Sequence, residues 1–294
     1  MPPKKKPREP KETDITTFIP EDHDLYDKRM VFLAPSGGGK SFLIKDIMQK
    51  LPRIPIGRII STSEKYDPYY SDFCPDILIS TDFDINVIQK FFDRATEISE
   101  LKKKNPKYKH VNNRSLLLLD DCFHLKKSWM KEPITGEIIS CGRHAFITLM
   151  VAMQSPKGFQ NELKGSIDFA FVGQHTSSTD RDTIFTSYAV GFETLGQFKK
   201  AMNKLEPKQF LVFKRTNTKS SKIIDNVFVY KAKEHNGFRM FSPLVWNEHQ
   251  RIYNPNYIKK YKQRKARELA EKEECEARKR QKKESRTHDI EFIN

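Results

Sequence analysis

The residues of this chain best suited to chemistry form the segment Ala34-Pro35-Ser36-Gly37-Gly38-Gly39-Lys40-Ser41. It follows the apolar run 30–33 and precedes a helical pattern that begins near Lys40. A strand, a glycine-rich turn and a helix in this order wrap backbone N–H groups around a phosphate, and the helix dipole adds positive potential. The lysine would reach the β- and γ-phosphates of a nucleotide, and the serine hydroxyl would bind Mg²⁺. The segment therefore predicts a nucleotide-phosphate site.

We expect the three glycines to adopt positive φ and to let the backbone approach the anion closely. Ala34 departs from the usual pattern, which has glycine at this position. Pro35 holds the residue before it in an extended conformation, which alanine adopts without strain, so Ala34 is expected to be the last residue of the strand. The predicted nucleotide-binding residues are Pro35, Ser36, Gly37, Gly38, Gly39, Lys40, Ser41 and Phe42.

Two carboxylates end a second apolar run, Leu116-Leu117-Leu118-Leu119-Asp120-Asp121. Ligands of open α/β sheets lie at the carboxyl ends of the strands, so Asp120 and Asp121 should share an edge with Lys40. One carboxylate would hold the Mg²⁺ shell, and the other would orient the attacking water. The structural alternative is an aspartate-rich turn.

Gln154 follows the apolar run 148–153 in the same way and could orient a lytic water or sense the γ-phosphate. Arg143 precedes that run, and Arg181 opens a later helix pattern. Either arginine could stabilise transition-state charge, and each could equally be a surface or ion-paired residue.

Apolar strand patterns alternate with helix patterns along the middle of the chain, which predicts an α/β fold with a mostly parallel sheet covered on both faces. An alternating pair near the C-terminus predicts antiparallel strands at that edge. The predicted strands are 30–33, 58–62, 76–80, 115–121, 147–153, 168–173, 209–214 and 227–232, and the predicted helices are 40–51, 86–104, 179–188 and 194–205.

Positive charge is concentrated at the two ends. Residues 1–11 have a net charge of +4 and residues 258–286 a net charge of +7, out of +15 for the whole chain. Basic tails favour polyanions, chiefly nucleic acid, although a solvated disordered tail has the same composition. We therefore divide the chain into a disordered basic segment (1–15), a folded domain (16–257) and a basic C-terminal tail (258–294).

The four cysteines show no disulfide or zinc spacing, which favours a reducing compartment. We see no signal peptide and no apolar run long enough to span a membrane, so no membrane association is expected. Residues 2–8 match the short basic peptides that direct nuclear import.

As a set, these motifs resemble the viral genome-packaging ATPases of the FtsK/HerA P-loop superfamily, of the kind found in poxviruses, other nucleocytoplasmic large DNA viruses, virophages and polinton-like elements. The resemblance covers about residues 28–215. It rests on the 34–41 loop, the acidic strand 116–121, Cys141-Gly142-Arg143-His144 leading to Gln154, and the stretch from Phe169 through Asp180-Arg181-Asp182.

The resemblance implies an ASCE, RecA-like P-loop NTPase that uses ATP and Mg²⁺ to translocate double-stranded DNA into a capsid. By the family pattern, Asp120 is the metal-side carboxylate, Asp121 the catalytic one and Gln154 the sensor, and the glutamine strand lies between the phosphate-loop strand and the acidic strand. The implied partners are DNA, capsid or portal vertex proteins, and copies of the same chain in a ring. The implied location is the host cytoplasm in a viral factory, the nucleus or the virion.

Two other functions fit parts of the pattern. A P-loop nucleoside or nucleotide kinase would share the loop and the carboxylates, but it gives Gln154 no role, and the sequence lacks an arginine-rich lid. A non-catalytic DNA-binding virion component with a degenerate phosphate loop would explain the departure at Ala34.

Overall fold

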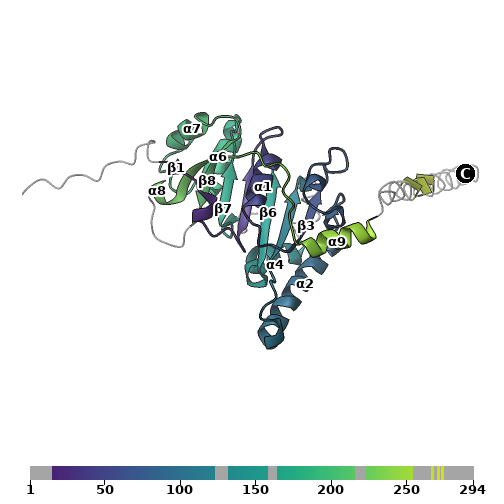
Figure 1. The fold of residues 1–294 in the computed structure, drawn as a ribbon. Helices are drawn as coiled ribbons and strands as arrows, with labels where there is room; N and C mark the ends of the chain where they lie inside the picture. The colour runs from purple at the N-terminus through teal and green to yellow at the C-terminus, as the bar shows by residue number, and fades with distance from the viewer. Residues whose placement is uncertain are drawn as a thin grey trace, which may run out of the picture. The chain divides into compact units, whose positions relative to one another are not determined.

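The computed structural model describes residues 15–122, 132–157, 164–215 and 223–253, together with 266–267, 270–271 and 273–274. The chain divides into two compact units, Met1–Trp246 and Asn247–Asn294, and helix α9 (Pro243–Ile252) contains residues of both. The described part of the first unit has a nine-stranded sheet in the order β1-β9-β8-β7-β2-β6-β5-β3-β4 (Figure 1). Residues 1–14 of the predicted basic segment 1–15 and most of the tail 258–294 lie outside the described residues.

The centre of the sheet is parallel and fully buried. Strands β2 (Arg29–Leu33), β5 (Ser115–Asp120), β6 (Ile147–Met153) and β7 (Phe169–Val172) contain only buried residues. Strand β3 (Ile56–Ser61) pairs in parallel with β5 on the other side. Near-continuous apolar runs form such strands because helices cover both faces of the sheet. The predicted α/β fold is confirmed.

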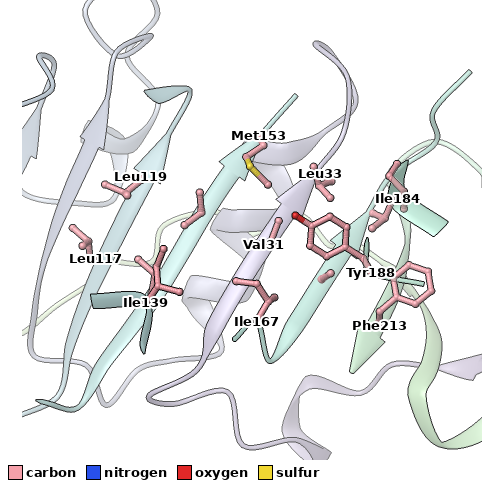
Figure 2. Close-up of a cluster of buried hydrophobic side chains, with 14 of the residues drawn as sticks. Val31, Leu33, Leu117, Leu119, Ile139, Met153, Ile167, Ile184, Tyr188 and Phe213 are labelled. Atoms are coloured by element: carbon pink, nitrogen blue, oxygen red, sulfur yellow. The ribbon is translucent and has the colours of Figure 1, made fainter. Parts of the chain in front are cut away.

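Successive strand residues point to opposite faces, which divides the core into two clusters. Val31, Leu117 and Met153 face the first cluster (Figure 2), and Phe32 and Leu118 face the second. Helix α1 packs on the second cluster, and the other α-helices with buried apolar residues pack on the first. The helices are α1 (Lys40–Gln49), α2 (Ile85–Lys104), α4 (Pro133–Cys141), α6 (Ser178–Ser187) and α7 (Leu195–Asn203).

The edges of the sheet differ in detail from the prediction. Strands β8 (Gln209–Lys214) and β9 (Val227–Lys231) form the expected antiparallel pair, but β1 (Thr16–Thr17) pairs in parallel beyond β9. The predicted strand 76–80 is wrong over its first part, because Asp76–Leu78 form the 3-10 helix η4 and only Ile79–Ser80 form β4. Pro75 precedes that turn and favours it over a strand. The remaining short helices are η2 (Pro20–Asp22), η3 (Tyr70–Asp72), η5 (Pro106–Tyr108), η7 (Gly142–Ala145) and α8 (Ile223–Asn226).

The strand register places the carboxyl ends of the central strands next to one another. Leu33 pairs with both Met153 and Val172, and Asp120 pairs with Ala152. Strand β6 lies between β2 and β5, as the resemblance implied. The residues that follow these strands therefore meet at the carboxyl edge of the sheet.

A buried carboxylate on helix α1 fixes the helix to strand β9 and to the residues that follow that strand. Asp46 is fully buried and accepts hydrogen bonds from Tyr230 Oη at 2.7 Å, Lys233 N at 2.8 Å and His235 Nε2 at 2.6 Å. Three donors satisfy a carboxylate that would otherwise be costly to bury. The helix that follows the phosphate loop is thereby held in place. Within the described residues, no helix is long and apolar enough to span a membrane.

Candidate nucleotide-binding and hydrolysis site

The glycine-rich loop lies between β2 and α1, at the carboxyl edge of the sheet. Gly37 has φ 72° and Gly39 has φ 81°, and Gly39 is the N-cap of α1. The N-cap supplies no side-chain hydrogen bond, so the first N–H groups of the helix remain available to an anion. The predicted loop geometry is confirmed at these two glycines.

Gly38 is needed for a different reason from the one predicted, because its φ is not positive. A Cβ atom there would lie 2.9 Å from both the Ala34 Cβ and the Pro35 carbonyl oxygen. A Cβ on Gly173, the residue after β7, would also lie 2.9 Å from the Ala34 Cβ. The methyl group of Ala34 thus occupies space that two glycines leave open, and this packing accommodates the departure from the loop pattern.

Gly173→Ala should destabilise the fold by about 1–3 kcal/mol, because the new methyl group overlaps Ala34 and approaches Phe210. Adding Ala34→Gly should restore part of the lost stability. It removes the Ala34 Cβ, which the backbone holds in place and which the new methyl group overlaps. Urea denaturation of both variants measures the effect. A double variant no more stable than Gly173→Ala alone would show that Ala34 is not the obstructing group.

Lys40 opens α1, and its side chain is buried. Its Nζ donates to the carbonyl oxygens of Ala34 at 2.8 Å and Pro35 at 3.2 Å. Burial lowers the pKa of Lys40, and the charges of Asp121 and Asp120 act in the opposite direction. An ammonium folded back onto the loop, with two carboxylates nearby, is well placed to exchange carbonyl partners for phosphate oxygens.

Asp120 is the last residue of β5 and is 2% exposed. Its Oδ2 accepts a hydrogen bond of 2.8 Å from the hydroxyl of Tyr70, which is also buried. Burial, followed by repulsion from Asp121, raises the pKa of Asp120 from 3.8 to about 6. The fold thus holds a carboxylate where its charge is costly, as is common in functional sites.

This cost predicts that Asp120→Asn stabilises the nucleotide-free protein. The folded-state pKa is raised, so the stability that this group contributes is complete below about pH 4 and is lost as the pH rises through 6. At pH 7.5 the neutral isostere should increase the free energy of unfolding by about 3 kcal/mol, and the gain should vanish near pH 4. Urea denaturation in EDTA measures both values, with Asp93→Asn on the exposed face of α2 as the control. A variant less stable than wild type at pH 7.5 would contradict this account of Asp120.

Asp121 and Gln154 lie together at the ends of neighbouring strands. The Gln154 Nε2 donates to Asp121 Oδ1 at 3.1 Å. Asp121 has φ 51°, an uncommon backbone conformation for a non-glycine residue, and its carbonyl oxygen accepts from Thr62 Oγ1 at 3.2 Å. Unusual backbone conformations are often found at functional sites. Of the residues predicted to take part in the reaction, Lys40, Asp120, Asp121 and Gln154 all lie at the carboxyl edge of the sheet.

Sequence reasoning missed the loop after β3, which completes the site. Glu64 is 6% exposed and accepts three backbone N–H bonds, from Tyr69 at 3.0 Å, Tyr70 at 3.1 Å and Ser71 at 2.9 Å. These bonds fix Tyr70, whose hydroxyl reaches Asp120. A buried tyrosine needs a partner for its hydroxyl. The Tyr69-Tyr70 pair after a predicted strand was the available signal, but it does not identify that partner.

The predicted Mg²⁺ ligands suit that ion in chemical type. Ser41 and Asp120 supply a hydroxyl and a carboxylate, and Mg²⁺ prefers oxygen ligands and retains several waters. Within the described residues, no group of three or more His, Cys, Asp or Glu side chains could hold a metal ion. Phe42 is half-buried, and Lys208 Nζ lies 4.0 Å from the centre of its ring.

The two candidate arginines lie at opposite edges of the sheet. Arg143 is exposed in η7, before β6 begins, and therefore lies away from the phosphate loop of its own chain. Arg181 lies in α6, after β7, and donates to the His175 carbonyl oxygen and to Asn203 Oδ1. The site of a single chain therefore has the loop, the carboxylates and the glutamine on one edge, and it does not include Arg143.

Comparison with known proteins gives sequence relatives in large DNA viruses. The chain is 27% identical over 237 residues to the uncharacterised protein L437 of Acanthamoeba polyphaga mimivirus, covering 79% of this chain and 82% of the relative. It is also 27% identical over 162 residues to the uncharacterised protein 075L of Invertebrate iridescent virus 6, covering 55% of this chain and 60% of that protein. No protein-family profile matches the chain.

The fold is similar to that of a viral packaging enzyme of known structure. The genome packaging NTPase B204 of Sulfolobus turreted icosahedral virus 2, solved in complex with AMP, superposes with a TM-score of 0.51 at 16% identity. The similarity covers 72% of this chain and 100% of B204. The resemblance inferred from the sequence is confirmed at the level of the fold. The likeness includes the mostly parallel sheet and its flanking helices.

Proposed function

We propose that this protein hydrolyses ATP and uses the energy to move double-stranded viral DNA into a capsid. The observation that carries the proposal is the meeting of Lys40, Asp120, Asp121 and Gln154 at one sheet edge, with Gln154 hydrogen-bonded to Asp121. The similarity to a packaging NTPase and the relatives in large DNA viruses support it.

Each residue has a role in this proposal that its position supports. Backbone N–H groups of the loop and of the first turn of α1, together with the Lys40 ammonium, bind the phosphates, because the loop leads into the N-terminus of α1. Mg²⁺, held by Ser41 and Asp120, would neutralise charge on the phosphates when bound. Asp121 orients and polarises the attacking water. Gln154 donates a hydrogen bond to Asp121 and keeps the carboxylate and the water in position. Phosphoryl transfer depends mainly on such positioning.

The main competing function is a nucleoside kinase, which would share the loop and the carboxylates. The Gln154–Asp121 hydrogen bond favours hydrolysis, because an amide beside a carboxylate is suited to holding a water molecule. The experiment follows the γ-phosphate of ATP in the presence of nucleosides and of double-stranded DNA. Release of inorganic phosphate, increased by DNA, supports the proposal, whereas transfer to a nucleoside supports the kinase. Tight DNA binding without ATP binding would instead support a non-catalytic virion component.

The proposal includes a ring of identical chains, in which an arginine from one subunit completes the site of its neighbour. Arg143 lies away from its own phosphate loop, and Arg181 lies near the carboxyl edge, so the two candidates differ in geometry. Mixing Arg143→Ala or Arg181→Ala chains with wild type tests both. We expect one variant to reduce turnover by more than its share of the mixture, because each altered chain disables a neighbour. A linear decrease for both variants would exclude a shared arginine.

A further inference from the structure

The end of α2 and the turn that joins it to β5 form the most basic segment of the described fold. Residues 102–114, Lys-Lys-Lys-Asn-Pro-Lys-Tyr-Lys-His-Val-Asn-Asn-Arg, contain five lysines, one arginine and one histidine. They include no carboxylate, and the next acidic residue is Asp120. We call residues 102–114 the basic turn.

The basic turn lies at the edge of the sheet opposite the phosphate loop. Helix α2 follows β4 and precedes β5, and β4, β3 and β5 are parallel, so α2 returns from the carboxyl edge to the amino edge. A helix of 20 residues is about 30 Å long, which carries its last turn well away from the nucleotide site. Figure 1 shows α2 running downward from the sheet. A ligand bound here would leave the nucleotide edge unobstructed.

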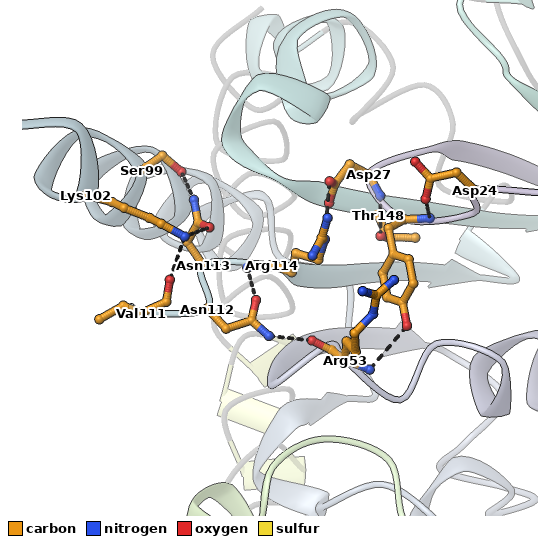
Figure 3. Close-up of polar contacts among 11 residues, drawn as sticks. Asp24, Asp27, Arg53, Ser99, Lys102, Val111, Asn112, Asn113, Arg114 and Thr148 are labelled. Atoms are coloured by element: carbon orange, nitrogen blue, oxygen red, sulfur yellow. Dashed lines mark hydrogen bonds and ion pairs between the residues drawn. The ribbon is translucent and has the colours of Figure 1, made fainter. Parts of the chain in front are cut away.

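Hydrogen bonds brace the basic turn, as Figure 3 shows. Lys102 Nζ donates to the Val111 carbonyl oxygen at 2.7 Å and to Asn113 Oδ1 at 3.3 Å. Asn113 is buried, and its Nδ2 donates to Ser99 Oγ at 3.1 Å. Asn112 Nδ2 donates to the Arg53 carbonyl oxygen at 2.6 Å. One lysine and two asparagines thus fix the turn, and Arg114 is half-buried and pairs with Asp27 at 3.4 Å. The remaining lysines project from this fixed base.

Those remaining lysines face solvent. Lys103, Lys107 and Lys109 are exposed, and no ion pair is described for any of them within the described residues. Lys104 is also exposed and forms an ion pair with the exposed Glu100 at 2.9 Å. Tyr108 stands between two of the lysines and is 44% exposed. The surface is therefore a cluster of exposed ammonium groups around one aromatic ring, with Glu100 as a neighbouring carboxylate.

We propose that the basic turn binds the phosphate backbone of double-stranded DNA. Lysine is depleted in protein–protein interfaces, whereas lysine contacts to phosphates are common in DNA complexes. A braced turn keeps the backbone positions of its lysines at fixed spacing, so binding orders few backbone groups. The inference rests on the proposed function, which requires a DNA contact, and assigns that contact to the folded domain as well as to the tails.

The test uses the full chain, with Lys103, Lys107 and Lys109 all replaced by glutamine. Affinity for a short fluorescent duplex is measured by anisotropy over a series of salt concentrations, without nucleotide. Each phosphate contact contributes about 0.9 to the slope of log affinity against log salt, so the slope should become shallower by about 2–3. Affinity at 100 mM salt should fall by about tenfold or more. Lys102 is left unchanged because it braces the turn.

The matched control replaces Lys90, Lys200 and Lys233, which are exposed and lie outside the basic turn, by glutamine. It removes the same charge and should leave the slope near that of wild type. If both triple variants reduce the slope equally, only net charge matters and the proposed surface is wrong. An unchanged slope in the basic-turn variant also overturns it, and loss of polyglutamate binding by that variant would then identify an acidic protein surface as the ligand. A wild-type protein whose ATP turnover does not respond to DNA overturns the proposed function instead, so the two failures are distinguishable.

Discussion

Lys40→Ala should reduce ATP turnover by about 10²–10³-fold, the usual effect of removing one preorganised group that stabilises developing charge. Lys40 is the cation at the start of α1, and its Nζ contacts the loop that would surround the phosphates. Steady-state phosphate release and nucleotide affinity, measured together, should both decrease.

The matched control is Lys50→Ala, just beyond the other end of the same helix. Lys50 pairs with the half-exposed Glu21 at 2.9 Å and lies away from the phosphate loop. Its loss should change turnover by less than a factor of two, because a surface ion pair contributes little. Equal turnover in Lys40→Ala and wild type would remove the phosphate loop from the reaction.

Asp121→Asn should reduce turnover by about 10²–10⁴-fold while ATP still binds, as expected when a group that activates the nucleophile is lost. Asparagine retains an oxygen that can accept the 3.1 Å hydrogen bond from Gln154, so the substitution removes charge and preserves geometry. Nucleotide affinity comes from a fluorescent ATP analogue and turnover from phosphate release.

A separate variant, Gln154→Ala, keeps the Asp121 charge and removes its partner. We expect a smaller loss in that variant, because the carboxylate can still contact water. If Asp121→Asn retains wild-type turnover, Asp121 is a turn residue, as aspartates at strand ends often are.

Much of the fold, and the edge of the sheet that carries the candidate site, could be predicted from the sequence. The spacing of apolar residues predicts the strands and helices, and the parallel pairing of the strands predicts which of their ends meet. The apolar runs before Ala34, Asp121 and Gln154 could only be buried strands, and parallel pairing then brings their ends to one edge. Edge strands were predicted less well, as at 76–80, because few neighbours constrain them.

Other features depended on contacts between residues far apart in the chain. Three such contacts join positions separated by 50 residues or more. Ala34 packs against Gly173, Tyr70 donates to Asp120, and Asp46 accepts a hydrogen bond from Tyr230. No local pattern encodes such partners. The basic turn was visible as composition, but its bracing and its place opposite the nucleotide edge required the topology.

The measurement closest to the central claim is displacement of a third strand from a DNA triplex by the full chain. A protein that moves along duplex DNA with energy from this site should displace the strand with ATP. It should not do so with a non-hydrolysable analogue or after Lys40→Ala. ATP hydrolysis that is stimulated by DNA, yet never accompanied by displacement, would contradict the account.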